Sequence, residues 1–476
     1  MKTRFAPSPT GHLHIGGVRT ALFNFLLTKK DNGHFIIRIE DTDFKRNKEE
    51  FVKSIEEDLL WLKLIDEKIF SNEKKNYFYR QSERINIYKK YINFLIKKNE
   101  AYLCFCSKKC LEQEKKIYLE KNKNKSYKYS RKCLNLKKKE IKILVEKKNP
   151  YVVRLKISRE KEYFFNDLIR KKIKFEGNDI EDFIILRQNG IPSYNFACVI
   201  DDHLMNITHV FRGEEHITNT AKQLVLYKIF DWKEPIFGHI SIILNKEKKK
   251  ISKRNDKNFY LIKELKKLGY LPSSILNYLL FLGWHSDDNE EFLSLDEMLK
   301  KFDYKNFHSR GAIFSLEKLN WYNNHYINKL KDEEFKLLAW KKISKFYKLN
   351  DNFKEKVENI SLLWKKELNF FEELIEMTSF FFQKSKEEII LNSKEILLIK
   401  KIRKMLISLN DWEIENISFF LNELPEKLEN SKKDIFSLLR KIITKKNKGP
   451  ELAKIIFFFG KKNMMNEFYN YINHDK

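Results

Sequence analysis

Residues 2–40 read KTRFAPSPTGHLHIGGVRTALFNFLLTKKDNGHFIIRIE. The first five of them, 2–6 (KTRFA), are typical of a short strand, and a loop rich in Pro and Gly follows. Apolar residues at helical spacing predict a helix over 18–29. The Asn-Gly pair at 32–33 is a turn signal before a second strand at 34–40. Strand, glycine loop, helix and strand form a βαβ unit, so this stretch predicts a parallel sheet.

The remainder of the chain divides into a mixed part and a helical part. Amphipathic patterns at 47–63 and 82–99 predict helices, and the Lys-, Glu- and Asn-rich segment 107–150 is typical of charged helices on an inserted module. Strand-like segments return within 151–244, and 309–476 is nearly all helical in pattern. We therefore expect an α/β N-terminal part, a Rossmann-type parallel sheet with an inserted α+β module, followed by an all-α C-terminal region.

Composition narrows the class of protein. The 476 residues include 94 Lys and Arg against 66 Asp and Glu, a formal net charge of +28. Such a charge attracts polyanions, nucleic acid foremost, although a genome rich in A and T would also supply many lysines without a binding role. The sequence opens with no signal-peptide pattern, and no apolar run approaches the roughly 18 residues of a membrane helix. We expect a cytoplasmic protein that does not enter a membrane.

The segment GHLHIGG, residues 11–17, lies between the first predicted strand and helix. The start of a helix leaves N–H groups without partners and carries partial positive charge, which suits phosphate. Gly16 and Gly17 let a nucleotide approach the backbone, and His14 can donate hydrogen bonds to phosphate oxygens. Alone, however, such a segment is more often an ordinary turn.

A basic segment, KISKR at residues 250–254, follows the apolar run HISIILN far downstream. Lys250 and Lys253 are three positions apart, so both can face one ligand and stabilise a leaving pyrophosphate. Lysine runs are common in this chain, and a solvated patch is the alternative interpretation. The pairing of this segment with the histidine–glycine motif favours a nucleotide site.

Together these motifs resemble the bacterial glutamyl-tRNA synthetases, a class I aminoacyl-tRNA synthetase family. Their HIGH-type motif resembles His14–Gly17, and their KMSKS-type motif resembles Lys250–Arg254. The resemblance continues in one order along nearly the whole chain, through RFAPSPTG (4–11), RTALFN (19–24), RIEDTD (38–43), EDFIILRQNGIPSYNFACVIDD (181–202), FRGEEH (211–216), GHISIILN (238–245), LPSSILNYLLFLGW (271–284), SLEKLNWYNNHYI (315–327) and GPELAKIIFFFGK (449–461).

The resemblance implies ATP-dependent ligation of L-glutamate to the 3′ end of tRNA(Glu). The glutamate carboxylate attacks the α-phosphate of ATP, giving glutamyl-adenylate and pyrophosphate, and the terminal tRNA hydroxyl then takes the glutamyl group and releases AMP. Neither step needs a protein nucleophile, so catalysis rests on positioning and electrostatics. Mg²⁺ is expected to accompany ATP. The family further implies a monomer.

The resemblance also implies site residues. It assigns catalysis to His14, Lys250 and Lys253. Glutamate contacts are expected from Arg4, Ala6, Ser8, Glu40, Tyr194, Cys198 and Arg212, with Cys198 standing where some relatives carry Asn. ATP contacts are expected from His14, Ile15, Gly16, Gly17, Glu215, Ile243, Lys250, Ile251, Ser252, Lys253 and Arg254. From residue type alone, Arg4 is equally typical of a surface charge, Glu40 of a helix cap and Tyr194 of a core.

The same resemblance implies a division of the chain. Residues 1–100 and 191–245 would form the two halves of the catalytic domain, and 101–190 the inserted module that binds the acceptor end. Residues 246–320 would contact the tRNA stem, and 321–476 would bind the anticodon. Unstacked anticodon bases are readable by aromatic and Arg side chains.

The cysteines pose a separate question. Their odd number, five, and the clustering of four of them argue against a disulfide framework. Some relatives bind zinc with a Cys-x-Cys pair, a later Cys and a fourth ligand two residues on. Here Cys104, Cys106 and Cys133 fill the first three positions, but Asn135 is a poor zinc ligand and Cys110 has an unlike spacing. A zinc site and a vestigial site both stay open.

Three other functions compete with this assignment. A short relative that modifies a tRNA base lacks the helical C-terminal region that this chain has. Gly17 and RFAPSPTG disfavour a glutaminyl-tRNA synthetase. A non-catalytic RNA-binding descendant is disfavoured because His14, Glu40 and Lys253 are all present. Whether tRNA(Gln) is also charged is left undecided by the sequence.

Overall fold

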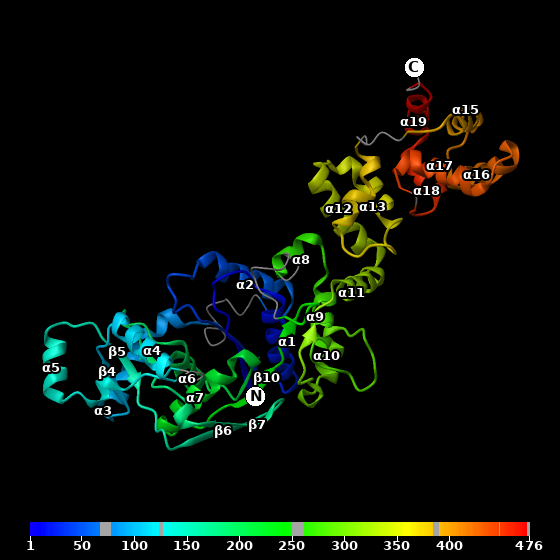
Figure 1. Cartoon of the computed structure of the whole chain (residues 1–476). Helices are drawn as coiled ribbons and strands as arrows, with labels where there is room; N and C mark the ends of the chain where they lie inside the picture. The colour runs from blue at the N-terminus through cyan, green and yellow to red at the C-terminus, as the bar shows by residue number, and fades with distance from the viewer. Residues whose placement is uncertain (67–77, 123–126, 250–260, 384–389, 447, 474–476) are drawn as a thin grey trace. The chain divides into compact units, whose positions relative to one another are not determined.

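The computed structural model describes residues 1–66, 78–122, 127–249, 261–383, 390–446 and 448–473 (Figure 1). The chain folds as two compact units. The first comprises Met1–Leu265 with Ile275–Leu316, and the second comprises Lys266–Ser274 with Glu317–Lys476. None of the helices within the described ranges is both long and apolar enough to cross a membrane.

Parallel strands form the centre of the first unit. Strand β2 (His34–Ile39) pairs in parallel with β1 (Lys2–Phe5) and with β3 (Phe78–Arg80), and β9 (His209–Gly213) pairs in parallel with β10 (Ile236–Ile240). Lys2 joins the two groups, since its N–H donates to the Thr208 hydroxyl at 2.8 Å and its carbonyl accepts the Thr208 N–H at 3.0 Å. The predicted parallel sheet is confirmed.

Helix α1 (Ile15–Lys30) is buried along most of its length, as expected for a βαβ crossover packed on its sheet. It begins three residues before the predicted start, because His14 caps it: the Gly17 N–H donates to His14 Nδ1 at 3.2 Å. The other helices of this sheet region are α2 (Glu49–Trp61), α3 (Ile85–Lys97), α6 (Tyr194–Leu204) and α7 (Ile217–Phe230).

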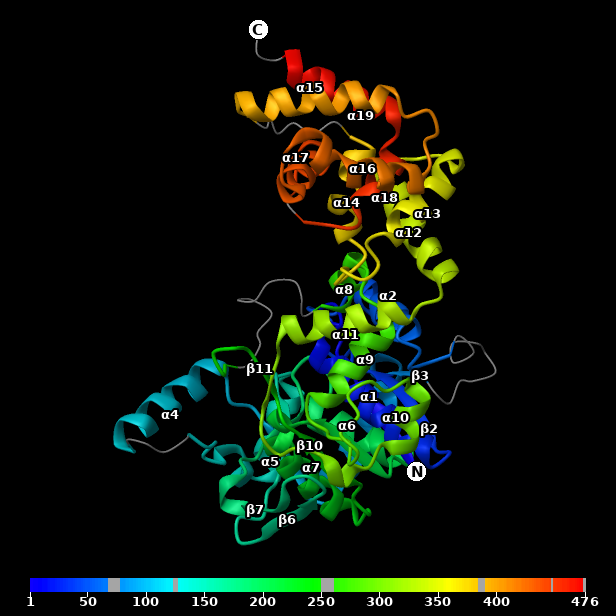
Figure 2. The ribbon, with the colours of Figure 1, turned by 90° about the vertical axis from the view of Figure 1, so that its right-hand side faces the viewer.

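The inserted α+β module carries an antiparallel sheet of β4 (Ala101–Cys104), β5 (Val152–Leu155) and β8 (Ile184–Leu186), with helices α4 (Lys108–Lys121) and α5 (Lys138–Glu146). Its second part is a hairpin of β6 (Glu162–Asp167) and β7 (Lys171–Glu176). This hairpin lies against β10 (Figure 1 and Figure 2). The centroids of the Phe165 and Phe237 rings are 5.4 Å apart, and the Leu168 N–H donates to the Phe237 carbonyl at 2.9 Å.

Past the sheet, a further parallel pair joins β11 (Ile243–Leu244) to β12 (Ala312–Ile313). The strand β12 lies inside 309–476, where the sequence predicted helix almost throughout. The helices between residues 262 and 329 are α8 (Ile262–Leu268), α9 (Pro272–Phe281), α10 (Leu295–Lys301) and α11 (Leu316–Lys329).

The second unit is helical, as predicted. Two apolar cores hold its described residues together, one formed from α11 to α14 and one from α15 to α19. Besides nearly all of α11, the unit contains the helices α12 (Asp332–Tyr347), α13 (Lys354–Leu362), α14 (Glu373–Met377), α15 (Ser393–Ile407), α16 (Ile414–Leu428), α17 (Lys432–Thr444), α18 (Leu452–Phe459) and α19 (Lys461–Asn473).

Helix α15 corrects one detail of the sequence pattern. The pattern predicts an apolar face made of Leu398, Ile402, Met405 and Leu409. In the structure the buried stripe is Ile396, Ile399, Ile402 and Leu406, with Leu398 and Met405 only half-buried at its edge. Apolar residues surround much of this helix, so periodicity alone could not fix which stripe faces the core.

Candidate functional site

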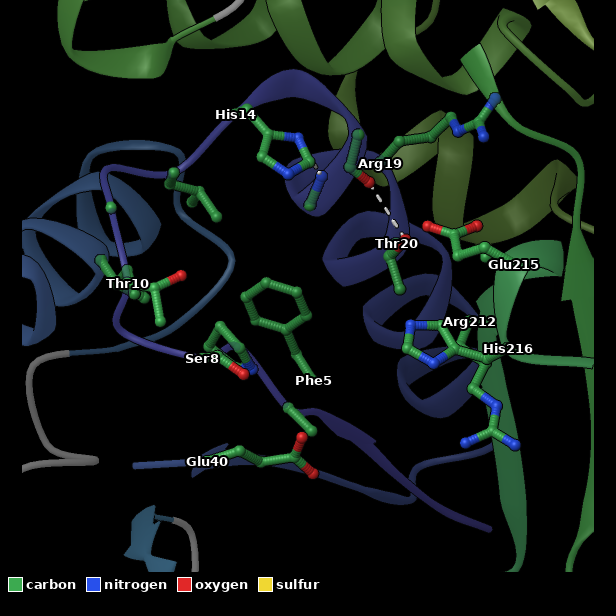
Figure 3. A pocket seen from close by; sticks show the side chains of 18 of the residues that line it. Phe5, Ser8, Thr10, His14, Arg19, Thr20, Glu40, Arg212, Glu215 and His216 are labelled. Carbon is green, nitrogen blue, oxygen red and sulfur yellow. Dashed lines mark hydrogen bonds between the residues drawn. The ribbon is translucent and has the colours of Figure 1, made fainter. Parts of the chain in front are cut away.

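A cavity of about 870 Å³ opens at the carboxyl ends of β1, β2 and β9, beside the start of α1 (Figure 3). Ligands of open parallel sheets bind at this edge, in the crevice between strand ends. The predicted glutamate contacts that line it are Arg4, Ala6, Ser8, Glu40, Tyr194 and Arg212, and the predicted ATP contacts that line it are His14, Ile15, Gly16, Gly17, Glu215 and Ile243.

Two sets of predicted residues do not meet there. Residues 250–254, the KISKR segment with its two predicted catalytic lysines, lie outside the described residues. Cys198 is fully buried and is not among the cavity's lining residues. Its Sγ accepts a hydrogen bond from Arg38 at 3.4 Å and donates one to Asp202 at 3.5 Å, so it lies behind the cavity wall.

Arg4 is held by a buried network of charges. Its Nε donates to Asp202 Oδ1 at 3.1 Å, and only 4% of the residue is exposed, which excludes the surface-charge alternative. Arg38 donates from Nη1 to the same Asp202 oxygen at 2.6 Å and from Nη2 to Glu40 Oε1 at 3.2 Å. A fixed carboxylate on Nε orients the Arg4 guanidinium along the cavity wall.

The pKa values of Asp202 and Glu40, two acids of this network, shift in opposite directions. Burial opposes the ionisation of Asp202, but the Arg38 and Arg4 guanidinium groups prevail and lower its pKa to about 2. Burial raises the pKa of Glu40 above its usual range despite Arg38 and Arg4. A positive charge beside Glu40 would favour its ionised form, and the ammonium group of an amino-acid ligand would supply that charge.

Arg212 approaches the cavity from β9. Its Nη2 donates to the Thr220 hydroxyl at 2.7 Å and to Gln223 Oε1 at 2.8 Å, and its Nη1 lies 3.5 Å from the Tyr194 hydroxyl. Burial and the neighbouring Glu40 raise the pKa of Tyr194, which keeps the phenol protonated at neutral pH. Arg4 and Arg212 therefore bring two cations to one largely buried site.

The start of α1 forms the other end of the cavity (Figure 3). Because His14 Nδ1 accepts the Gly17 N–H, the ring proton sits on Nε2, a donor for an anion. A Cβ atom on Gly16 would lie 3.1 Å from the His14 ring, and one on Gly17 would lie 3.0 Å from Leu13 Cδ1. Small residues thus keep this helix start open.

Three supporting groups escaped the sequence analysis. Arg38, Asp202 and Arg19 all lie in quoted motifs, but nothing in their spacing assigns them a partner. Arg19, on α1, donates to the carbonyls of Leu282 and Ser241 and also lines the cavity. Burial lowers its pKa to about 10 although Glu215 and Glu214 oppose this, so it remains a cation.

The cysteine cluster lies apart, in the inserted module. The sulfur atoms of Cys104, Cys106 and Cys133 all lie within 4.8 Å of one another, and Cys110 does not join them. Tyr129 Oη is 3.4 Å from Cys104 Sγ and 3.3 Å from Cys106 Sγ. Three sulfur atoms at this spacing fit around one tetrahedral zinc, with the phenol oxygen as the fourth donor that the sequence did not suggest.

Comparison with known proteins places the chain in a family. Residues 1–321 match the family described as tRNA synthetases class I (E and Q), catalytic domain, and residues 335–466 match the anticodon binding domain family. The glutamate–tRNA ligase of Mycoplasma genitalium is 40% identical over 482 residues, covering 99% of this chain and 98% of the relative. That of Finegoldia magna is 38% identical and covers 99% of each chain.

A solved structure agrees along the full length. The glutamate–tRNA ligase of Elizabethkingia meningosepticum, crystallised in complex with its amino acid, matches with a TM-score of 0.86 and 32% identity, covering 100% of both chains. Sequence and structure agree across both the catalytic and the helical unit. The chain belongs to the glutamate–tRNA ligase family of class I tRNA synthetases.

Proposed function

We propose that this chain uses ATP to join L-glutamate to the 3′ end of tRNA(Glu) through a glutamyl-adenylate, and that the cavity beside α1 is where both substrates meet. The observation that carries the site is the meeting of two buried guanidinium groups and a buried carboxylate with the start of a helix in one cavity. Glutamate offers two carboxylates and one ammonium, and ATP offers a polyanion.

The glutamate end of the cavity uses charge pairing. Arg4 and Arg212 are the partners for the carboxylates, and Glu40 is the partner for the α-ammonium. The hydroxyls of Ser8 and Tyr194 and the backbone at Ala6 add hydrogen bonds. A buried site that leaves its charges unpaired rejects an uncharged analogue strongly, so selection against glutamine needs no editing site.

The ATP end uses the start of α1. The N–H groups around Ile15, Gly16 and Gly17 and the Nε2–H of His14 donate to phosphate oxygens. Glu215 serves the ribose and the backbone at Ile243 serves the base. Residues Lys250, Ile251, Ser252, Lys253 and Arg254 complete the set, with Lys250 and Lys253 stabilising the leaving pyrophosphate. Mg²⁺ arrives with ATP as part of the substrate.

The chemistry then follows from position. A carboxylate oxygen of glutamate attacks the α-phosphorus of ATP, the bond to the bridging oxygen breaks, and pyrophosphate leaves with the electron pair. The terminal hydroxyl of tRNA next attacks the activated carbonyl carbon, loses its proton and expels AMP. His14 and the two lysines stabilise charge that grows in the first step. The protein holds the reactants in line and supplies no nucleophile.

The wider assignments are part of the same proposal. Residues 101–190 bind the acceptor end, 246–320 contact the stem and 321–476 bind the anticodon, in keeping with the family match over 335–466. The enzyme works as a monomer in the cytoplasm. Cys104, Cys106, Cys133 and Tyr129 would hold a zinc ion, which would brace the inserted module.

The test is exchange of labelled pyrophosphate into ATP with glutamate, with and without tRNA. Exchange that requires glutamate, and is not supported by glutamine or aspartate, supports the proposal. A chain that binds tRNA(Glu) but catalyses no exchange under either condition is the RNA-binding descendant instead. Aminoacylation of separate tRNA(Glu) and tRNA(Gln) then defines the RNA substrate.

A further inference from the structure

His239, on β10, lies between the inserted hairpin and the amino-acid site without taking part in either substrate set. Neither it nor its partner Asp167 lines the cavity. The side chains of both are fully buried. A buried histidine–carboxylate pair beside a substrate-binding arginine requires a physical reason, because burying such groups is costly unless each is fully bonded.

Asp167, the last residue of β6, is saturated with hydrogen bonds. Its Oδ2 lies 2.6 Å from His239 Nδ1, and its Oδ1 accepts the backbone N–H groups of Ile169 and Arg170 at 2.9 and 2.8 Å. Its carboxylate also accepts the His239 N–H at 3.1 Å. Although burial opposes ionisation, the bonds from His239 and the backbone lower the pKa of Asp167. The group is therefore a fixed anion.

This anion determines the state of the imidazole. The pKa of His239 lies below its ordinary value because the effect of burial outweighs the opposing effect of Asp167, so the ring is neutral at pH 7. The Asp167 carboxylate then places the ring proton on Nδ1 and leaves Nε2 as an acceptor. That acceptor faces Arg212, whose Nε lies 3.4 Å away, and the Thr220 hydroxyl, which lies 2.9 Å away.

Arg212 is thus held on two edges. Nε faces His239, and Nη2 faces Thr220 and Gln223. Nη1, on the remaining side, lies toward Tyr194 and the cavity. Rotation of the guanidinium would break the contact with His239, so the imidazole fixes the plane in which Arg212 can meet a carboxylate.

We propose that Asp167 and His239 are positioning residues: they orient Arg212, and Arg212 binds glutamate. The β6–β7 hairpin of the inserted module, which carries Asp167, is thereby part of the amino-acid site. The inference rests on the proposed function. A second link supports it: Arg170, after β6, forms an ion pair with Glu214, and Glu214 accepts the Ile242 N–H at 2.9 Å.

The test compares Asp167→Asn and His239→Gln with the unaltered enzyme in the pyrophosphate-exchange assay. Asp167→Asn keeps the size of the side chain and removes the anion that fixes the tautomer, and His239→Gln replaces the imidazole by an amide of similar size. We expect the KM for glutamate to rise about tenfold, the value of one charge-assisted hydrogen bond, while the KM for ATP stays within about twofold. Glu162→Gln is the matched control, because it removes an exposed acid from the same strand, one that pairs with Lys174 across the hairpin.

A second arm separates positioning from general damage. In an Arg212→Lys background the two changes should add less than about twofold to the glutamate KM, because residues that act as one unit are not additive. An equal rise in both KM values, an unchanged glutamate KM, or an undiminished effect beside Arg212→Lys would overturn the inference. If the unaltered enzyme shows no glutamate-dependent exchange, the proposed function itself fails.

Discussion

Asp202 is the residue whose removal tests the electrostatic framework of the site most sharply. It is 3% exposed, and a single oxygen binds both Arg4 and Arg38. Asp202→Asn keeps the volume of the side chain and one acceptor oxygen but removes the charge. Two buried guanidinium groups then lose their shared partner. Leaving buried charges uncompensated lowers stability more than replacing the whole network by apolar residues would.

The expected loss of unfolding free energy can be worked out in two ways. Breaking a buried ion pair by removing one partner costs roughly 3–5 kcal/mol. The pKa of Asp202 falls from its ordinary 3.8 to about 2 on folding, so its ionisation contributes about 2 kcal/mol to the stability of the folded state. Because the folded pKa lies below the unfolded one, this contribution is fully present above about pH 5 and is lost as the pH falls from 4 toward 2.

The assay is urea unfolding at pH 7, 5, 4 and 3, monitored by hydrogen–deuterium exchange of peptides from β1 and β2. These peptides report the unfolding of the first unit alone. We expect the variant to be about 3 kcal/mol less stable at pH 7 and 5, with a gap that narrows at pH 4 and further at pH 3. Asp231→Asn, an exposed change at the end of α7, is the control. A gap under about 0.5 kcal/mol at pH 7, or one that widens in acid, would refute the reasoning.

Four further predictions concern single groups. Arg212→Lys should raise the glutamate KM about 100-fold and leave the ATP KM unchanged in steady-state exchange, because an ammonium cannot replace a planar fork. His14→Asn should lower kcat for exchange about 100-fold without lowering the melting temperature, since Asn still caps α1; full activity would remove His14 from catalysis. Cys198→Ser should leave the glutamate KM within about threefold, because Cys198 lies behind the cavity wall, and a larger rise would restore it as a direct contact. Purified protein should contain one zinc per chain by atomic absorption, and Tyr129→Phe should weaken its retention against a chelator about tenfold; a metal-free chain would make the cluster vestigial.

The sequence predicted the parallel sheet because the sheet depends on local patterns, whereas the residues expected at the site came from the family resemblance. Strand, glycine loop and helix occur within residues 2–30, and the carboxyl ends of neighbouring parallel strands must meet. In the structure, Glu40 and residues of the 4–8 segment converge at that edge and line the cavity. The helical second unit followed from periodicity in the same way.

The supporting network could not be predicted, because it joins residues far apart in the chain. Arg38 meets Asp202 across 164 positions, and Asp167 meets His239 across 72. Each is an unremarkable polar residue beside apolar neighbours, and only the packing of β2 on α6, or of the hairpin on β10, brings the partners together. Tyr129 escaped for the same reason, since no spacing rule marks a tyrosine as a partner for cysteines.

The most direct measurement of the central claim is transfer of labelled glutamate to purified tRNA(Glu) by the full chain. We expect one glutamate per tRNA, joined as an ester that mild base cleaves, formed only with ATP and abolished when His14 and Lys253 are both replaced. Charging that survives this double replacement, or tRNA that is bound but never esterified, would contradict it.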